Sequence, residues 1–156
     1  MHRPLPTDLI NICMLYFSYG MNTNRDGMAQ RCPGAVSLGH ARLIDRVFRF
    51  AVHADVVKCS GSYVDGVLWQ IEPHHLNALD SLEGYPFYYN RRPLRVHYQE
   101  RTLLAETYYM TPGKLDEPPG QSYFDMVVKG YTEHNVPLDQ LYNSVYESTT
   151  ANLLKI

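Results

Sequence analysis

The first residues that could do chemistry lie in a glycine-containing loop at positions 19–24, between an apolar run and a stretch of helical length. A buried strand that ends in glycine and leads into a helix N-terminus directs several backbone N–H groups to one spot, which favours an anion. The loop lacks the GxxxxGK[ST] and GxGxxG patterns of nucleotide-binding loops. On spacing alone it predicts either an anion site or an ordinary capped strand–helix turn.

A second candidate is the carboxyl group of Glu83, which we expect in the last turn of a helix that Gly84 ends. A carboxylate there faces the negative end of the helix dipole, an unfavourable place for a purely structural acid. Tyr85, Tyr88 and Tyr89 follow closely, and apolar surroundings raise a carboxyl pKa toward the range useful in acid–base catalysis. The residues alone leave two interpretations open, a general acid/base and a solvent-facing surface glutamate.

Histidines and cysteines give no comparable signal. His53 and Asp55 share a strand face, adjacent His74 and His75 are expected to diverge, and no HExxH motif is present, so we expect no metal site. There is also no GxSxG or Cys/His pattern for nucleophilic catalysis. The three cysteines are an odd set without CxxC spacing, which speaks against a disulfide framework and indicates a cytoplasmic protein.

Charge and hydropathy exclude two further classes of partner. Fourteen basic and sixteen acidic residues give a net charge of −2, so there is no bulk electrostatic reason to bind nucleic acid or an anionic membrane. Arg91, Arg92 and Arg95 near tyrosines do not change this expectation, because no RNA-binding motif accompanies them. No apolar run approaches the roughly 18 residues of a membrane span.

The elements that must position these residues are strands in the first two thirds of the chain and helices at its end. The length of 156 residues predicts one domain, with residues 1–10 as a loose tail. The order indicates an α+β fold or a mixed α/β barrel. We expect strands at 12–19, 42–44, 47–52 and 63–71, helices at 25–31 and 72–83, a hairpin of 88–99 and 102–110 turning at 100–101, a loop at 112–120, and helices at 122–133 and 138–154.

Four motifs taken in order, over about residues 14–145, make the sequence similar to a known family. They read YFSYGMN from Tyr16, GVLWQI from Gly66, LDSLEG from Leu79, and the pair Tyr88-Tyr89. Together they resemble the γ-glutamylcyclotransferase-like (AIG2-like) family. The resemblance implies a small mixed β-barrel with flanking helices and no cofactor. It also implies an enzyme that releases 5-oxoproline from a small γ-glutamyl amide by intramolecular attack of the α-amine on the γ-carbonyl.

The resemblance assigns roles to residues by position. Glu83 corresponds to the catalytic glutamate, able to take a proton from the attacking amine and return one to the leaving amine. The family loop reads Tyr-Gly-Ser-Asn, and Met21 replaces its serine, so a hydroxyl contact to substrate is lost while backbone donors remain. The implied substrate-binding residues are Tyr19, Gly20, Met21, Asn22, Tyr88, Tyr89, Tyr109 and Tyr123.

Two alternatives stay beside this hypothesis. The substrate could be a γ-glutamylamine, such as an isopeptide-linked lysine, with residues 112–120 deciding the leaving group. The chain could instead be a non-catalytic binder of a small carboxylated metabolite, an interpretation that Met21 supports. A homodimer formed through tyrosine-rich strands is also compatible with the sequence.

Overall fold

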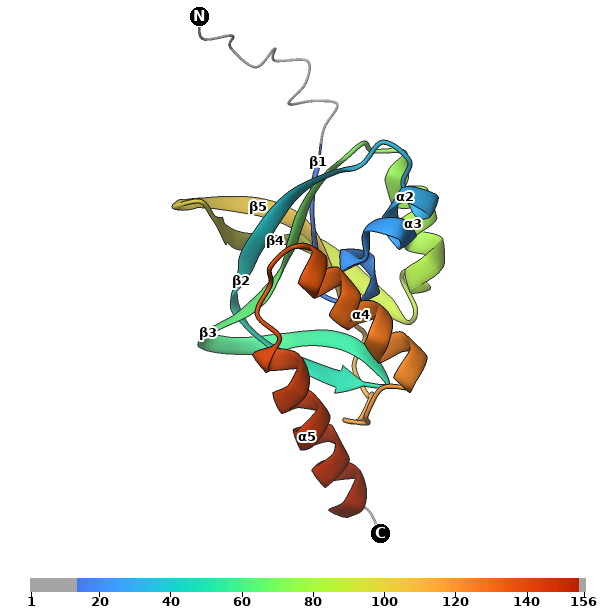
Figure 1. The fold of residues 1–156 in the computed structure, drawn as a ribbon, viewed down its shortest axis with the longest axis vertical. Coiled ribbons are helices and arrows are strands. Elements are labelled where there is room, and N and C mark those ends of the chain that lie inside the picture. Colours follow the sequence, from blue (N-terminus) through green and yellow to red (C-terminus); the bar gives the residue numbers. More distant parts are fainter. Residues whose placement is uncertain (1–13, 155–156) are drawn as a thin grey trace, which may run out of the picture.

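The computed structural model describes residues 14–154, so the tail predicted for residues 1–10 lies outside the described part of the chain. Within that part, five strands form a closed barrel in the order β1-β3-β2-β4-β5 (Figure 1). Neighbours pair antiparallel except β1 and β5, which are parallel and close the barrel. The predicted α+β class, a small mixed barrel with flanking helices, is confirmed. The strands are β1 (Met14–Ser18), β2 (Val36–Ala51), β3 (His53–Ile71), β4 (Tyr89–Tyr98) and β5 (Arg101–Met110).

The long hairpin of β2 and β3 supplies the curvature of the barrel. Its register shifts twice, between Ser37 and Gly39 and between Ile44 and Arg46. The second shift contains Asp45, whose φ of 58° is left-handed. Bulges of this kind bend a strand and increase its twist, which a small barrel requires. The two short strands predicted at 42–44 and 47–52 are therefore parts of β2, which bends at the bulge without ending.

The β4–β5 hairpin turns at Gln99 and Glu100, one residue earlier than predicted. Both have positive φ, 46° and 64°, as a two-residue type I′ turn requires. On its other side β4 meets β2 over only two residue pairs, Arg42 with His97 and Leu43 with Val96. Beyond these pairs the two strands lack ladder contacts, and Pro93, which has no N–H to donate, lies on the unpaired stretch of β4. We call this opening the β2–β4 seam.

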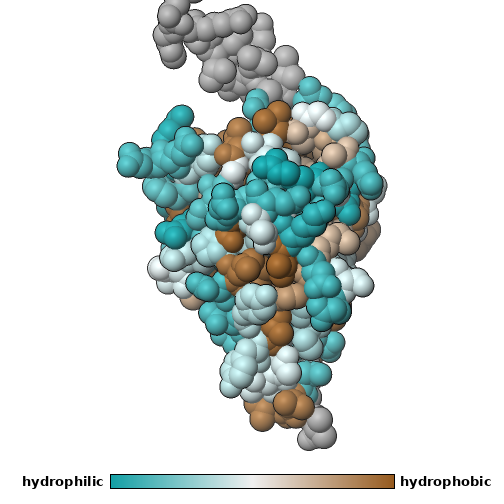
Figure 2. All heavy atoms as spheres, viewed as in Figure 1, coloured by the Kyte–Doolittle hydropathy of each residue, from teal (hydrophilic) through white to brown (hydrophobic). Residues whose placement is uncertain are grey.

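Helices cover the barrel and fix its ends. In Figure 1, α4 lies against the barrel and α5 runs away from it. Hydrophobic atoms gather near the end of α5 (Figure 2), where Leu153 and Leu154 are exposed. None of the helices in residues 14–154 is long and apolar enough to cross a membrane. The helices are α2 (Arg25–Arg31), α3 (His75–Glu83), α4 (Gln121–Glu133) and α5 (Asp139–Leu154), with a 3-10 turn at Met21–Thr23.

The packing of α3 and β1 fixes the two segments that carry the candidate residues. Asp80 on α3 accepts hydrogen bonds from the Arg91 guanidinium at 2.8 Å and from the Tyr108 hydroxyl at 2.6 Å. Gly66 on β3 lies so close to β1 that a Cβ there would overlap the Ser18 carbonyl and the Phe17 ring. The end of β1 and the end of α3 are therefore both held in place by contacts with neighbouring strands.

Candidate active site

The loop after β1 is a single 3-10 turn that leads directly into α2. The Thr23 N–H donates to the Gly20 carbonyl at 3.1 Å, and the Thr23 hydroxyl reaches the same carbonyl at 2.7 Å. Asn24 then caps α2 by accepting the Gly27 N–H at 3.1 Å. These bonds hold Gly20, Met21 and Asn22 in one tight turn, and all three line a pocket.

Helix α4 packs against this loop and holds it in position. Gly130 packs so closely that a Cβ there would overlap the Thr23 hydroxyl and lie 2.6 Å from the Asn24 nitrogen. The buried Tyr131 hydroxyl donates to the Tyr19 carbonyl at 2.6 Å. Gln140 on α5 in turn donates to the Tyr131 hydroxyl at 2.7 Å. The position of the loop is therefore set by residues more than one hundred positions away in the sequence.

Asn22 connects the loop to Glu83. Its side-chain N–H₂ donates to the Tyr16 hydroxyl at 3.0 Å and to Glu83 Oε1 at 3.4 Å. Its carbonyl oxygen accepts from Arg31 Nη1 at 3.0 Å, which fixes the orientation of the amide. Arg31 also contacts the Met21 sulfur through Nη2 at 3.9 Å. A buried amide held at both ends thus presents a donor to the carboxyl group.

The environment of Glu83 changes its acidity. Glu83 is the last residue of α3 and is followed by Gly84 in the left-handed conformation, so its carboxyl lies at the negative end of the helix. Burial raises the pKa of Glu83 to about 7, against the opposing effect of the Arg31 charge. A carboxyl group with this pKa is available in both protonation states near neutral pH, which acid–base catalysis requires.

The raised pKa makes Glu83 a pH-dependent cost to stability. Because the folded state binds this proton more tightly than the unfolded state, stability falls as pH rises from the ordinary carboxyl range through about 7. At pH 8 we expect the free energy of unfolding of Glu83→Gln to be higher than that of the wild type, with a difference on the order of 3 kcal/mol. Near pH 4 the two free energies should be equal. Urea unfolding at the two pH values measures this; equal stability at pH 8 would contradict the burial of the charge.

Tyrosines form most of the remaining wall, and Ala54 on β3 holds two of them. The Tyr89 hydroxyl donates to the Ala54 carbonyl at 2.6 Å, and the Tyr123 hydroxyl accepts the Ala54 N–H at 3.0 Å. Tyr88 lies at the edge, where its hydroxyl is 3.0 Å from Nδ1 of His53. Together with the loop and Glu83 they line a pocket of about 310 Å³, a size that suits a small metabolite.

The pocket contains all but one of the residues that the sequence assigned to it. The structure places Tyr109 outside the walls of this pocket. Neighbouring side chains on a strand point to opposite faces, so Tyr108 enters the pocket and Tyr109 lies under Arg46 instead. The prediction gave no role to several further lining residues: Tyr16, Phe17, Ser18, His53, Ala54, Ser81, Leu82, Gly84 and Tyr108. Most of them belong to the quoted motifs and could have been included with their neighbours, whereas His53, Ala54 and Tyr108 lie outside these motifs.

Comparison with known proteins identifies the family. A family model described as gamma-glutamyl cyclotransferase, AIG2-like, matches residues 16–125, well over half of the chain, and includes both the loop and Glu83. The chain belongs to this family. A human relative named gamma-glutamylcyclotransferase is 29% identical over 138 residues, which span 80% of this chain and 73% of the relative.

Solved structures agree with membership of the γ-glutamyl cyclotransferase family. One named gamma-glutamyl cyclotransferase superposes with a TM-score of 0.75 at 28% identity, covering 83% of this chain and 85% of that one. YkqA from Bacillus subtilis gives a TM-score of 0.72 at 20% identity, covering 86% of this chain and 54% of YkqA, a likeness of fold alone. The predicted family is confirmed, and with it the assignment of the chain to a family of cyclotransferase enzymes.

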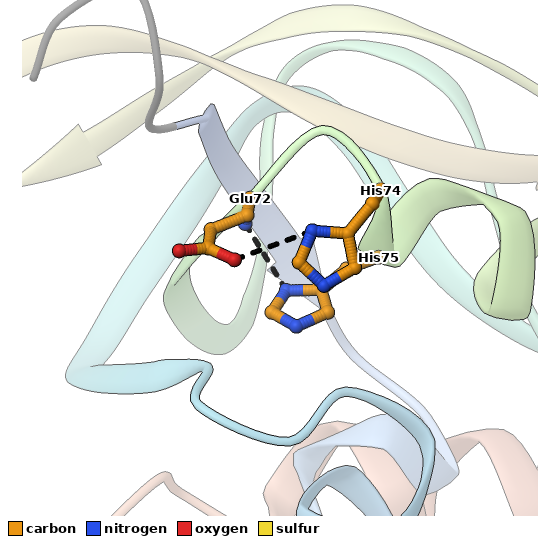
Figure 3. A group of neighbouring side chains, drawn as sticks. All are labelled: Glu72, His74 and His75. Atoms are coloured by element: carbon orange, nitrogen blue, oxygen red, sulfur yellow. Dashed lines mark hydrogen bonds and ion pairs between the residues drawn. The ribbon is translucent and has the colours of Figure 1, made fainter. Parts of the chain in front are cut away.

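One group of side chains in this cyclotransferase family member has the composition of a metal site. The ligand atoms of Glu72, His74 and His75 lie within 4.8 Å of one another (Figure 3). The two histidines were expected to diverge, yet their ring centroids are 4.3 Å apart because a turn precedes α3. His75 accepts the Glu72 N–H through Nδ1 at 3.1 Å and donates through Nε2 to the Pro33 carbonyl at 2.8 Å. Both ring nitrogens are thus engaged, so the buried histidine acts as a structural link at the start of α3.

Proposed function

We propose that this protein releases 5-oxoproline from a small γ-glutamyl amide, with Glu83 as general acid/base. The observation that carries the proposal is a carboxyl group of pKa about 7 in the same pocket as the loop at Gly20–Asn22. The family and its named relatives support the reaction class. The proposal extends to a single domain over residues 1–156 that acts in the cytoplasm without a cofactor. Free Cys32 and Cys59 are consistent with that compartment.

The proposed reaction needs one proton carrier. The α-amine nitrogen of the γ-glutamyl group attacks its own γ-carbonyl carbon, a C–N bond forms to close the five-membered ring, and the original amide C–N bond breaks. Glu83 takes the proton released by the attacking nitrogen and returns a proton to the leaving nitrogen. Asn22 positions the carboxyl through its 3.4 Å hydrogen bond, and the loop orients the substrate.

The leaving group is the open part of the proposal. Residues 112–120 approach the pocket edge through Lys114, whose Nζ lies 4.6 Å from the centre of the Tyr88 ring. Arg49 anchors this segment by donating to the Lys114 carbonyl at 2.8 Å. A leaving amine that emerges past Tyr88 would meet Lys114, so we propose that this segment selects between γ-glutamyl amino acids and γ-glutamylamines.

The test is a mass-spectrometric assay for 5-oxoproline with γ-glutamyl amino acids, γ-glutamylamines that include an isopeptide-linked lysine, and glutathione. Product from one class names the leaving group. If the folded protein binds members of this panel without turning them over, the result would favour the alternative of a non-catalytic carboxylate binder. The replacement of the family's loop serine by Met21 suggests that alternative. Size-exclusion chromatography of the same sample tests the proposed homodimer.

The pH dependence of turnover should follow the Glu83 carboxyl. Because the carboxylate form must accept the proton of the attacking amine, we expect kcat to rise with pH and level off above about 7. Well below that value the rise is about tenfold for each pH unit. Initial rates of 5-oxoproline release at saturating substrate between pH 5 and 9 measure the profile. A kcat that stays constant from pH 5 to 8 would contradict the assignment of Glu83 as the base.

A further inference from the structure

A second cleft lies at the β2–β4 seam, away from the candidate active site. It has a volume of about 410 Å³ and shares no lining residue with the pocket around Glu83. Strands β2, β3, β4 and β5 all contribute to its walls, because β2 and β4 separate beyond Leu43 and Val96. The cleft is therefore a consequence of the short β2–β4 ladder.

Arg46 is a buried charge in the wall of this cleft. Only 8% of its surface is exposed, and its guanidinium makes no hydrogen bond or ion pair with any residue of the described range 14–154. It lies 5.7 Å from the centre of the Tyr109 ring, and burial together with the nearby Arg92 charge lowers its pKa. Asp55 is the acidic group whose charge reaches Arg46, but its two oxygens already accept from Arg49 Nε at 2.8 Å and from the Met110 N–H at 2.8 Å. A largely buried cation that shares its nearest carboxylate in this way is costly, so the site is incomplete as a purely internal arrangement.

A second cation adds to the same unbalanced charge. Lys58 on β3 pairs directly opposite Arg46 on β2, and like charges in that position repel. Asp45 is the carboxylate among the lining residues, and it already accepts from Arg95 Nη2 at 2.9 Å and from the Gly61 N–H at 2.9 Å. These two bonds engage both oxygens of the Asp45 carboxylate, so the lining of the cleft keeps an excess of positive charge.

We propose that the β2–β4 seam binds a small dianion, either a phosphate ester or a dicarboxylate, between Arg46 and Lys58. Three cations and one carboxylate line the cleft, and this excess of two positive charges matches two negative charges on a ligand. A planar guanidinium beside an ammonium suits phosphate and carboxylate oxygens alike. The Ser60 hydroxyl supplies a further donor, while Leu94 and Leu104 offer apolar contacts to the body of the ligand. The anion would also relieve the repulsion across the β2–β3 pair.

The experiment is an NMR titration of the whole chain with inorganic phosphate and with succinate, and with acetate as the monoanion control. Saturable amide shifts at Arg46, Lys58 and Ser60 are expected for at least one dianion. Lys58→Gln, which changes an exposed side chain, should weaken binding about tenfold. Lys129→Gln, an exposed lysine on α4, is the matched control and should leave binding unchanged.

Arg46→Met supplies a second readout that does not depend on finding the natural ligand. Without added anion its Tm should equal or exceed that of the wild type, because an unpaired buried charge is removed, and dianions should no longer raise it. Preference for phosphate or for succinate distinguishes the two ligand sources. The proposal is overturned if neither dianion binds, if both variants bind as the wild type does, or if the shifts are confined to Gly20–Asn22.

Discussion

Glu83→Gln will lower the release of 5-oxoproline by roughly 10²- to 10⁴-fold, the usual contribution of a positioned general acid/base. Glutamine is nearly isosteric and can still accept the Asn22 hydrogen bond through its amide oxygen, so the pocket should keep its shape. Only the ability to take up and return a proton is lost. Steady-state assays over the γ-glutamyl panel, with circular dichroism to verify the fold, measure this effect.

A matched control separates proton transfer from a general effect of lost charge. Glu147 on α5 is exposed and lies outside both clefts, so Glu147→Gln should retain wild-type turnover. Substrate should still bind to Glu83→Gln, which isothermal titration calorimetry can verify. Wild-type rates in Glu83→Gln would refute the mechanism and return the carboxyl to a structural role.

Gly130→Ala will disturb the loop from its far side. Glycine to alanine inside a helix ordinarily stabilises by about 0.5–1 kcal/mol. At this position the added Cβ would overlap the Thr23 hydroxyl and approach the Asn24 nitrogen to 2.6 Å, so either α4 or the loop must move. We expect a net loss of about 1–3 kcal/mol in stability, as for other overpacked sites, and a fall in turnover as Asn22 shifts relative to Glu83.

The comparison for this variant is Gly120→Ala at the start of the same helix. A Cβ at Gly120 would meet nothing within 4 Å, so its substitution should cost only the N-cap preference of glycine over alanine, on the order of 1 kcal/mol or less, and should leave turnover unchanged. Urea unfolding and the 5-oxoproline assay on both variants provide the measurement. Equal behaviour of the two variants would show that the contact between α4 and the loop does not hold the site.

Local patterns in the sequence predicted the parts of the fold that depend on local chemistry. The apolar run before Gly20 predicted β1, and the leucine spacing with Gly84 predicted the end of α3 at Glu83. Register on β5 was harder to predict, because Glu106, Thr107 and Tyr108 are all buried and the usual alternation is missing. Without that alternation, the sequence could not tell which of the two neighbouring tyrosines faces the pocket.

Features that depend on distant packing have no local signal. Gly130 occupies an ordinary position within a predicted helix, and its contact with Thr23 exists only once α4 lies against the loop. Arg46 follows Leu43, Ile44 and Asp45 in a strand that also contains Arg42 and Arg49, and its lack of an ion pair within residues 14–154 is a property of the bulge at Asp45 and the open seam. Both depend on how the barrel closes.

The contacts of α4 and α5 that hold the loop after β1 also determine how long a segment of this chain must be to fold with its site intact. The family match stops at residue 125, inside α4, yet the Tyr19 carbonyl is held by Tyr131 and, through it, by Gln140. Gln140 also exchanges two hydrogen bonds with the backbone of Asp65, at 2.8 and 2.7 Å, which ties α5 to β3. A gene fragment trimmed to the matched segment would encode the loop and the glutamate without the frame that holds them in place. The shortest segment that keeps the site in place is therefore the barrel together with α4 and the first turn of α5.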